Sequence, residues 1–357
     1  MTGRELDFSN PEVIRLVTES FVPVAENVTA LQSSDDDKGR FFREVAVQGR
    51  MKGRSRPDVS HQGIYAFAAD GMSLASGNPL EAEGTLARLR EALASWEQRD
   101  GDHGLTRDFS DQDYGDHEYP EDGVVLRLTV RDLPRSEGSP FAEGEERFAK
   151  TWNNDLVWLR REDVHALLSD PLTVGARRDV SQALLQRLAR FHLRDIVRGE
   201  PYAWGPDAVE RIELVAEVTR RDGSMAALAY RGHVLLRDGV EFRDAHEPND
   251  WAFDNELDAA ICGQASCNEE IQTFEAFALL VAGQRSGAHR YNVRTNDAGP
   301  APIGFSLQLA GNSPWERTPP HVMRTWTRAG ESRLPTATTV TDEPYYGEPL
   351  AARKGNR

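Results

Sequence analysis

Apolar residues near the N-terminus follow the period of a helix in two places. Leucine and tryptophan side chains recur at spacings of three, four and three residues over 86–96, which predicts an amphipathic helix at 85–96. Earlier, Asn10 followed by Pro11 predicts the start of another helix, because Asn caps free amides and Pro suits the first turn. The apolar stretch Phe21–Val24 then predicts a strand.

Between these helices the pattern predicts a β-hairpin. Residues 62–67 are mainly apolar, and Asp70-Gly71 follows them before Leu74. Asp-Gly favours the tight turn that joins two antiparallel strands. The acidic run 33–37 predicts a solvated loop, with a cation site as the alternative because carboxylates bind metal ions.

The order of helix, strand, middle segment, hairpin and closing helix over residues 10–96 resembles the thioredoxin-like superfamily. The residues that carry this resemblance are Asn10-Pro11-Glu12-Val13, Phe21-Val22-Pro23-Val24, Asp70-Gly71 and Leu86 to Trp96. The resemblance implies an incomplete α/β unit of that type. The family's Cys-x-x-Cys would precede the first helix, where this chain has only residues 1–9 and no cysteine. Thiol–disulfide exchange at the family's usual site is therefore not expected, and a scaffold or docking role remains.

Four segments are predicted from these changes in composition. Residues 1–97 form the thioredoxin-like unit, and 98–122, rich in Asp, Gly and His, form an acidic linker without the spacing of a calcium-binding EF-hand. Residues 123–326 form a second domain, and 327–357, with several prolines and many polar residues, form an extended or disordered tail.

The second domain is predicted to be mainly antiparallel β-structure with one long helix. Alternating or apolar runs predict the strands, and Asp222-Gly223 predicts a hairpin turn. Asp179 or Ser181 caps a helix with an apolar stripe that is expected to run to Gly199. The predicted strands are 124–130, 212–218, 226–236, 274–281, 291–294 and 303–309. The chain as a whole is therefore expected to belong to the α+β class.

Two clusters in this domain contain residue types used in catalysis. On the predicted helix, His192, Asp195 and Arg198 follow one another at intervals of three, so a carboxylate would orient an imidazole as in general-base catalysis. A structural hydrogen bond and ion pair explain the same spacing. Farther on, His289 is followed by Arg290 and Arg294, which are suited to proton transfer and to binding a carboxylate or phosphate. An ordinary polar strand edge is the alternative there.

Cys262 and Cys267 are the chain's two cysteines. Their spacing differs from that of Cys-x-x-Cys redox and zinc motifs, so two reduced thiols are expected. A disulfide within a loop, or a zinc site completed by His246 or His289, remains the alternative. No cofactor is otherwise predicted.

Composition limits the classes of partner. The net charge of −16 is unsuited to broad contact with nucleic acid or an anionic membrane, because both require a basic surface. The sequence has no apolar stretch long enough to span a membrane and no apolar run of signal-peptide type after Arg4. A cytoplasmic protein that binds a small molecule or a protein partner is expected.

Two functions stay open at this level. The first is a redox-inactive binding or accessory protein with a ligand or peptide pocket in the second domain. The second is an enzyme that uses His192 and Asp195, or His289 with Arg290 and Arg294, with a metal-dependent form through Cys262 and Cys267. The two differ in whether these side chains converge in one concave pocket.

Overall fold

The protein divides into two compact units, residues Met1–Gly115 and Asp116–Arg357. The boundary falls within the stretch 98–122 that the sequence predicts as a linker. The computed structural model describes residues 8, 10–24, 28–33, 35–54, 60–79, 81–99, 119–135, 148, 151–168, 173–199, 201, 203–238, 254–268, 270, 272–288, 292, 294, 296–311, 314–317, 320–322 and 345.

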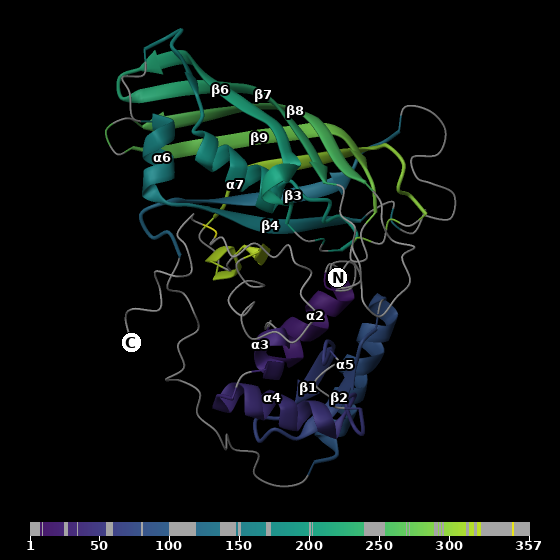
Figure 1. Cartoon of the computed structure of the whole chain (residues 1–357). Helices are drawn as coiled ribbons and strands as arrows, with labels where there is room; N and C mark the ends of the chain where they lie inside the picture. The colour runs from purple at the N-terminus through teal and green to yellow at the C-terminus, as the bar shows by residue number, and fades with distance from the viewer. Residues whose placement is uncertain are drawn as a thin grey trace. The chain divides into compact units, whose positions relative to one another are not determined.

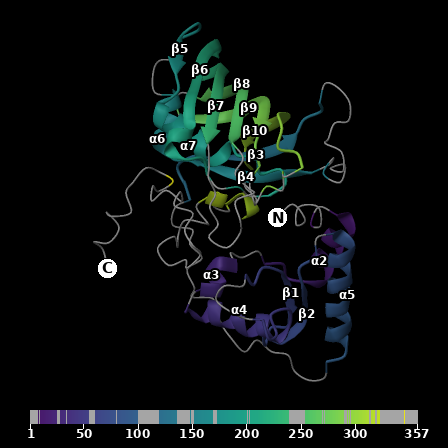
Figure 2. The ribbon, with the colours of Figure 1, turned by 45° about the vertical axis from the view of Figure 1, so that its right-hand side comes forward.

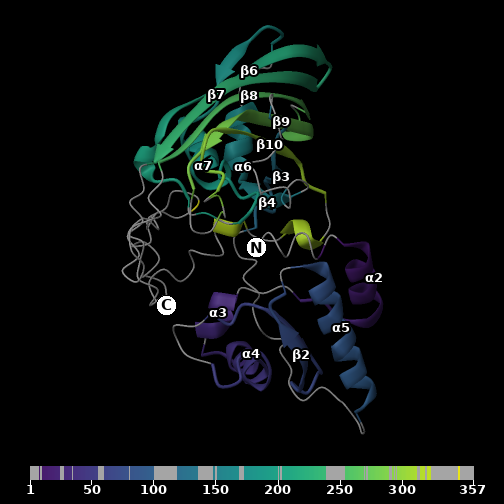
Figure 3. The same ribbon diagram turned by 90° about the vertical axis from the view of Figure 1, so that its right-hand side faces the viewer.

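The smaller unit combines helices with a β-hairpin. Helix α5 packs against α2 through a small apolar core around Val13, Leu86 and Leu89, and it also covers β2 (Figure 3). The elements are α2 (Pro11–Ser20), α3 (Val28–Ser33), α4 (Asp37–Gln48), β1 (Ile64–Phe67), β2 (Ser73–Gly77) and α5 (Ala82–Glu97).

Local signals in the smaller unit act as predicted at three points. The Asn10 side chain accepts hydrogen bonds from the amides of Glu12 and Val13, at 2.9 and 3.3 Å, at the start of α2. Strands β1 and β2 pair antiparallel, and Gly71 in their connection has a φ of +86°, which glycine adopts without strain. The predicted helix at 85–96 lies within α5.

Two predictions for this unit are wrong. Phe21–Val24 is not a strand. The amide of Phe21 still bonds to the Val17 carbonyl as a helix cap, while Val22 and Val24 are 90% and 72% exposed and have no neighbouring strand to cover them. The acidic run is not simply a loop either. Asp36 caps α4 by accepting a 2.7 Å bond from the Gly39 amide, because helix N-termini attract carboxylates.

The larger unit is built on one eight-stranded antiparallel sheet in the order β4-β3-β10-β9-β8-β7-β6-β5 (Figure 2). Its α+β composition agrees with the predicted class. The strands are β3 (Val124–Asp132), β4 (Trp152–Leu159), β5 (Arg177–Asp179), β6 (Val209–Asp222), β7 (Met225–Asp238), β8 (Asn255–Asn268), β9 (Thr273–Ser286) and β10 (Ala301–Leu309). The helices are α6 (Arg161–Leu168) and α7 (Gln182–His192), with short 3-10 turns at Pro206–Ala208 and Pro314–Arg317.

The core of this unit lies between the inner face of the curved sheet and helix α7 (Figure 1). Alternate residues of each strand point inward, as Leu257, Ala259 and Ile261 do on β8, and all three are nearly fully buried. Leu184 and Leu185 of α7 pack against this face. The sheet therefore forms a curved wall, and the helix closes its concave side.

Five of the predicted strands are confirmed as β3, β6, β7, β9 and β10, and the Asp222-Gly223 turn joins β6 to β7. Strand β8 was not predicted, although its inward residues alternate in the sequence. The predicted strand 291–294 is wrong where it is described, since Asn292 lies in a turn and Arg294 outside any strand. The predicted tail lies outside the described residues, apart from the buried Tyr345.

The long helix predicted from residue 181 to 199 is also shorter in the structure. Helix α7 ends at His192, and Leu193 to Gly199 form bends and turns. In the described residues, no helix combines the length and apolarity needed to cross a membrane.

Candidate functional site

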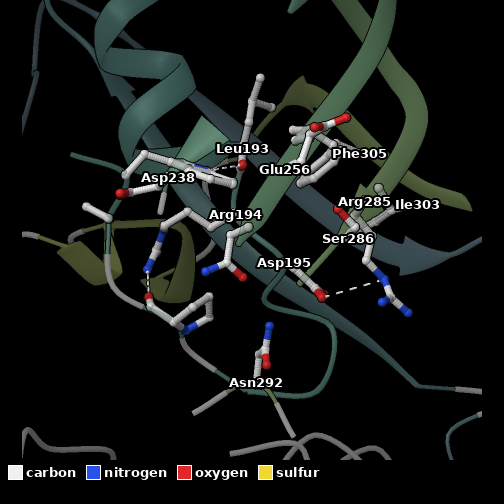
Figure 4. A pocket seen from close by; sticks show the side chains of 15 residues that line it. Leu193, Arg194, Asp195, Asp238, Glu256, Arg285, Ser286, Asn292, Ile303 and Phe305 are labelled. Atoms are coloured by element: carbon white, nitrogen blue, oxygen red, sulfur yellow. Dashed lines mark hydrogen bonds and ion pairs between the residues drawn. The ribbon is translucent and has the colours of Figure 1, made fainter. Parts of the chain in front are cut away.

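A pocket opens where α7 ends, beside the first residues of β8 and β10 and the last residues of β9 (Figure 4). The space between its walls and its mouth is about 680 Å³. It lies at one end of the concave face, because the lining residues of β8 and β10 begin these strands and those of β9 end it. The end of α7 therefore leaves open a part of the sheet that the helix would otherwise cover.

Most of the pocket wall is apolar. Leu257, Ile303 and Phe305 line it from the sheet, and each is almost completely buried. Leu193 and Trp204 line it from the segment after α7, and the Trp204 indole donates a 2.8 Å hydrogen bond to the Leu193 carbonyl. This bond fixes the indole, so the wall is shaped before any ligand binds.

The polar lining is concentrated at Asp195 and Arg285. Their side chains face each other in Figure 4, with Arg285 Nε 3.9 Å from an Asp195 oxygen. This buried Nε has no hydrogen-bond partner among the described residues. Other polar lining residues are Arg194, Asp238, Asn255, Glu256, Ser286 and Asn292.

Behind the pocket lies a buried ion cluster centred on Arg294. Its guanidinium makes paired bonds to Asp195 at 2.7 and 2.8 Å and to Asp132 at 2.7 and 2.8 Å, and it donates one more at 3.2 Å to Asp297. These five bonds match the five N–H groups of arginine. The Arg294 side chain is completely buried, so it holds the site together and has no donor left for a ligand.

Asp297 extends the cluster to three further arginines. It accepts bonds from Arg198 at 2.8 Å, from Arg285 at 2.6 Å and from Arg135. Four guanidinium groups thus surround three carboxylates, those of Asp132, Asp195 and Asp297. Because each charge has an opposite partner, the cluster fixes the loop after β9 against the end of β3 and the segment after α7.

The cluster also fixes the ionisation state of its members. Burial would raise the pKa of Asp195, but Arg294 and Arg285 lower it below its ordinary value. The pKa of Asp297 is lowered in the same way by Arg285, Arg135 and Arg198 against the effect of burial. Asp195 is therefore a carboxylate at neutral pH, and it acts in the pocket as a hydrogen-bond acceptor.

His192 lies outside this cluster. Its Nε2 is 2.8 Å from the hydroxyl of Tyr345, and its Nδ1 is 3.7 Å from an oxygen of Asp155 on β4. The Tyr345 hydroxyl also bonds to the backbone of Trp158 on β4, at the edge of the sheet. All three side chains are buried, so they join α7, β4 and Tyr345 as a structural contact.

His192 is neutral in this setting. Burial lowers the pKa of its imidazole despite the opposing effect of Asp155, and Arg194 and Arg187 lower it further. The pKa of Asp155 is about 2, because its contacts with His192, Arg194 and the His321 amide outweigh the effect of burial. The contact thus pairs a neutral imidazole with a carboxylate.

The structure separates the two halves of the predicted His192, Asp195 and Arg198 group. Because α7 ends at His192, the helical spacing does not continue, and the carboxylate beside His192 is Asp155. Asp195 and Arg198 belong to the ion cluster with Arg294, and Asp195 also lines the pocket. His289 and Arg290 lie outside the described residues.

Cys262 and Cys267 do not form a common site. Both lie in β8, and their odd spacing places Cys262 on the exposed outer face and Cys267 on the buried inner face. Strand geometry separates them by about 16 Å along β8. The two thiols are free in the structure, so the predicted alternative of a loop disulfide does not form. In the part of the chain that the structure describes, no group of three or more His, Cys, Asp or Glu side chains is placed to hold a metal ion.

Sequence reasoning missed Arg285 and Trp204, which shape the pocket, and Asp132, which completes the cluster. Arg285 follows Val281 and Gly283 on the inward face of β9, so an arginine on an apolar strand face was the available signal. Such a residue is rarely buried without a partner. Asp132 and Trp204 gave no such signal, because their partners are distant in sequence.

The comparisons with known proteins give no relative. No protein-family model matches the chain, and no curated protein or solved structure is significantly similar to it.

Proposed function

We propose that the larger unit is a binding module for a small molecule that has an apolar body and a polar end. The observation that carries this proposal is the pocket at the end of α7, where the facing pair Asp195 and Arg285 lies beside an apolar wall formed by the inner face of the sheet. A concave pocket that combines an apolar wall with fixed polar groups is typical of small-molecule sites.

The charges favour a neutral or positively charged polar end. The lining carries three carboxylates, Asp195, Asp238 and Glu256, and two guanidinium groups, Arg194 and Arg285. An anion would add to the excess of negative charge. A hydroxyl, amide or amine group donates to Asp195, and a hydroxyl or amide oxygen also accepts from the free Nε–H of Arg285.

Binding is favoured over catalysis by the positions of the candidate residues. His192 is buried against Tyr345 and Asp155 and does not line this pocket, and Arg294 uses all of its donors within the ion cluster. The described candidates thus do not converge as a base and an anion-binding group. Of the predicted residues, Asp195 lines the pocket. Arg294 holds its carboxylate in place, and the carboxylate can accept a hydrogen bond from a ligand.

For the smaller unit we propose a scaffold or docking role in a cytoplasmic protein. The resemblance to thioredoxin-like proteins remains a prediction: the hairpin and closing helix agree with it, whereas the expected strand at Phe21–Val24 does not form. The unit has no cysteine, so thiol exchange is not part of the proposal.

The test of the pocket uses the fluorophore N-phenyl-1-naphthylamine, a neutral aromatic molecule with one N–H donor. We expect saturable binding to the full chain with a rise in probe fluorescence. Replacing the pocket residue Ala203 by tryptophan fills the space, and should weaken binding at least about tenfold, equivalent to about 1.4 kcal/mol.

The matched control is Ala276→Trp, which adds the same side chain to an exposed position of β9. It should bind the probe as the unmodified protein does. Absence of saturable binding, or equal weakening by both variants, would show that the pocket does not bind this class of molecule.

A further inference from the structure

A second cavity lies deeper under α7, on the same concave face of the sheet. Nine apolar side chains and His192 line it. Leu188 lines it from the helix, while Ile261, Leu279 and Leu307 line it from three neighbouring strands. A cavity with such walls excludes water and is suited to an aliphatic group.

The two cavities are neighbours along the same strands. On β8 the outer pocket is lined by Leu257 and the inner cavity by Ile261, which are four residues and about 13 Å apart. On β10 the corresponding residues are Phe305 and Leu307. Inward positions two residues apart are adjacent on one face of a strand, so the two cavities follow each other along this wall.

Small residues line the wall between the cavities, and Leu193 borders both. Ala259 and Gly283 are paired across β8 and β9, midway between the residues that line the two cavities. Both positions lie on the inward face, where Ala259 has only a methyl group and Gly283 has no side chain. Leu193 lines both cavities from the segment after α7. Its side chain is thus the group that a molecule extending from the outer pocket to the inner cavity must pass.

We propose that the two cavities form one binding site and that the ligand is an amphipathic molecule with an unbranched aliphatic chain. The polar end lies at Asp195 and Arg285 in the outer pocket, and the chain passes Leu193 into the inner cavity. This inference rests on the proposed binding function and names its ligand class. The site gains affinity from the inner cavity only when the chain is long enough to enter it.

The experiment measures displacement of N-phenyl-1-naphthylamine by n-butanol, n-hexanol, n-octanol and n-decanol. A hydroxyl end suits the polar pair, since it both donates and accepts. We expect affinity to rise about threefold to fourfold for each methylene through decanol, as expected for burial of a methylene group. If the rise stops at hexanol while the probe still binds, the single-site inference is wrong and the outer pocket stands alone. If the probe itself does not bind, the proposed function fails.

Neighbouring residues of β9 provide a matched pair of variants. Leu279→Phe adds volume to the inner cavity, whereas Leu280→Phe adds the same volume on the exposed outer face. Leu279→Phe should remove the rise in affinity from hexanol to decanol, and it should leave the affinities for butanol and the probe unchanged. Leu280→Phe should leave the affinities for all the alcohols and the probe unchanged. Equal chain-length dependence in both folded variants would overturn the inference.

Two further variants support this comparison. If Leu279→Phe does not fold by circular dichroism, Leu188→Phe fills the same cavity from the helix and carries the same expectation. Leu193→Ala removes the side chain between the cavities, and should tighten decanol binding severalfold relative to butanol binding. Unchanged decanol affinity in Leu193→Ala would contradict the passage at Leu193.

Discussion

The local ion pairs within helices α2 and α5 of the smaller unit differ from the buried ion cluster of the larger unit in burial and in the distance along the chain that they span. In the smaller unit, Arg15–Glu19 and Arg88–Glu91 link residues three or four positions apart, and their side chains are about half exposed. In the larger unit, Arg294 joins Asp132 and Asp195, which lie 162 and 99 positions away, and is completely buried. Exposed pairs contribute little to stability, whereas breaking a buried cluster leaves charges without partners. The difference teaches that charge in this chain determines structure mainly where it is buried.

The strongest test of this contrast is Arg294→Met. Removing the guanidinium leaves Asp132 and Asp195 buried without their main partner, so we expect the larger unit to lose about 3–5 kcal/mol of unfolding free energy. Urea dependence of hydrogen exchange in peptides from β7 and β8 measures this for the unit itself. Arg294→Lys keeps the positive charge but lacks the planar guanidinium group. Its stability should lie between those of Arg294→Met and the original protein. A variant as stable as the original protein would contradict the assigned role of the cluster.

The second test concerns the buried contact of His192 with Asp155 and Tyr345. The pKa of His192 is lowered by burial, so below about pH 6.5 the unfolded chain takes up a proton that the folded chain does not. Stability is therefore fully present above this pH and falls as the pH decreases. We expect a loss of about 1 kcal/mol between about pH 6.5 and 5.5, measured by the same exchange experiment.

His192→Gln should remove this part of the pH dependence, because glutamine does not titrate. Tyr345→Phe keeps the imidazole in place and should retain the slope while lowering stability at every pH. If the slope is the same with and without His192, another group carries it and the assignment to this contact is wrong.

The smallest effects are expected in the smaller unit. Asn10→Ala removes the cap of α2 and should cost about 1 kcal/mol, seen as faster hydrogen exchange in that helix. Arg88→Ala removes one exposed ion pair of α5 and should change stability less than Asn10→Ala does. An Arg88→Ala effect larger than that of Asn10→Ala would remove the contrast between the units.

The sequence was sufficient for features that depend on a few neighbouring residues. The Asn10 cap, the turns at Gly71 and Gly223 and five strands of the larger sheet follow from local patterns. The end of α7 at His192 did not follow, because the apolar stripe continues to Ile196 and no glycine or proline occurs before Gly199. Packing of the segment after His192 against β4 and the ion cluster overrides the local preference.

The candidate site was less accessible to sequence reasoning. Asp195 and Arg294 were among the predicted residues, but their direct pairing requires contact between segments about a hundred residues apart. The prediction of a strand at Phe21–Val24 was wrong because a strand needs a partner strand, and an apolar run by itself does not supply one.

The order of strands in the large sheet sets an expectation for how it folds. Strands β6 to β9 are joined in sequence and pair with their neighbours, so each pairing closes a short loop. The pairing of β3 with β10 joins Leu128 to Leu307 and closes a loop of about 180 residues, which costs more chain entropy. Strands β6 to β9 should therefore form early, and the pocket wall on β10 should be completed only when β3 arrives.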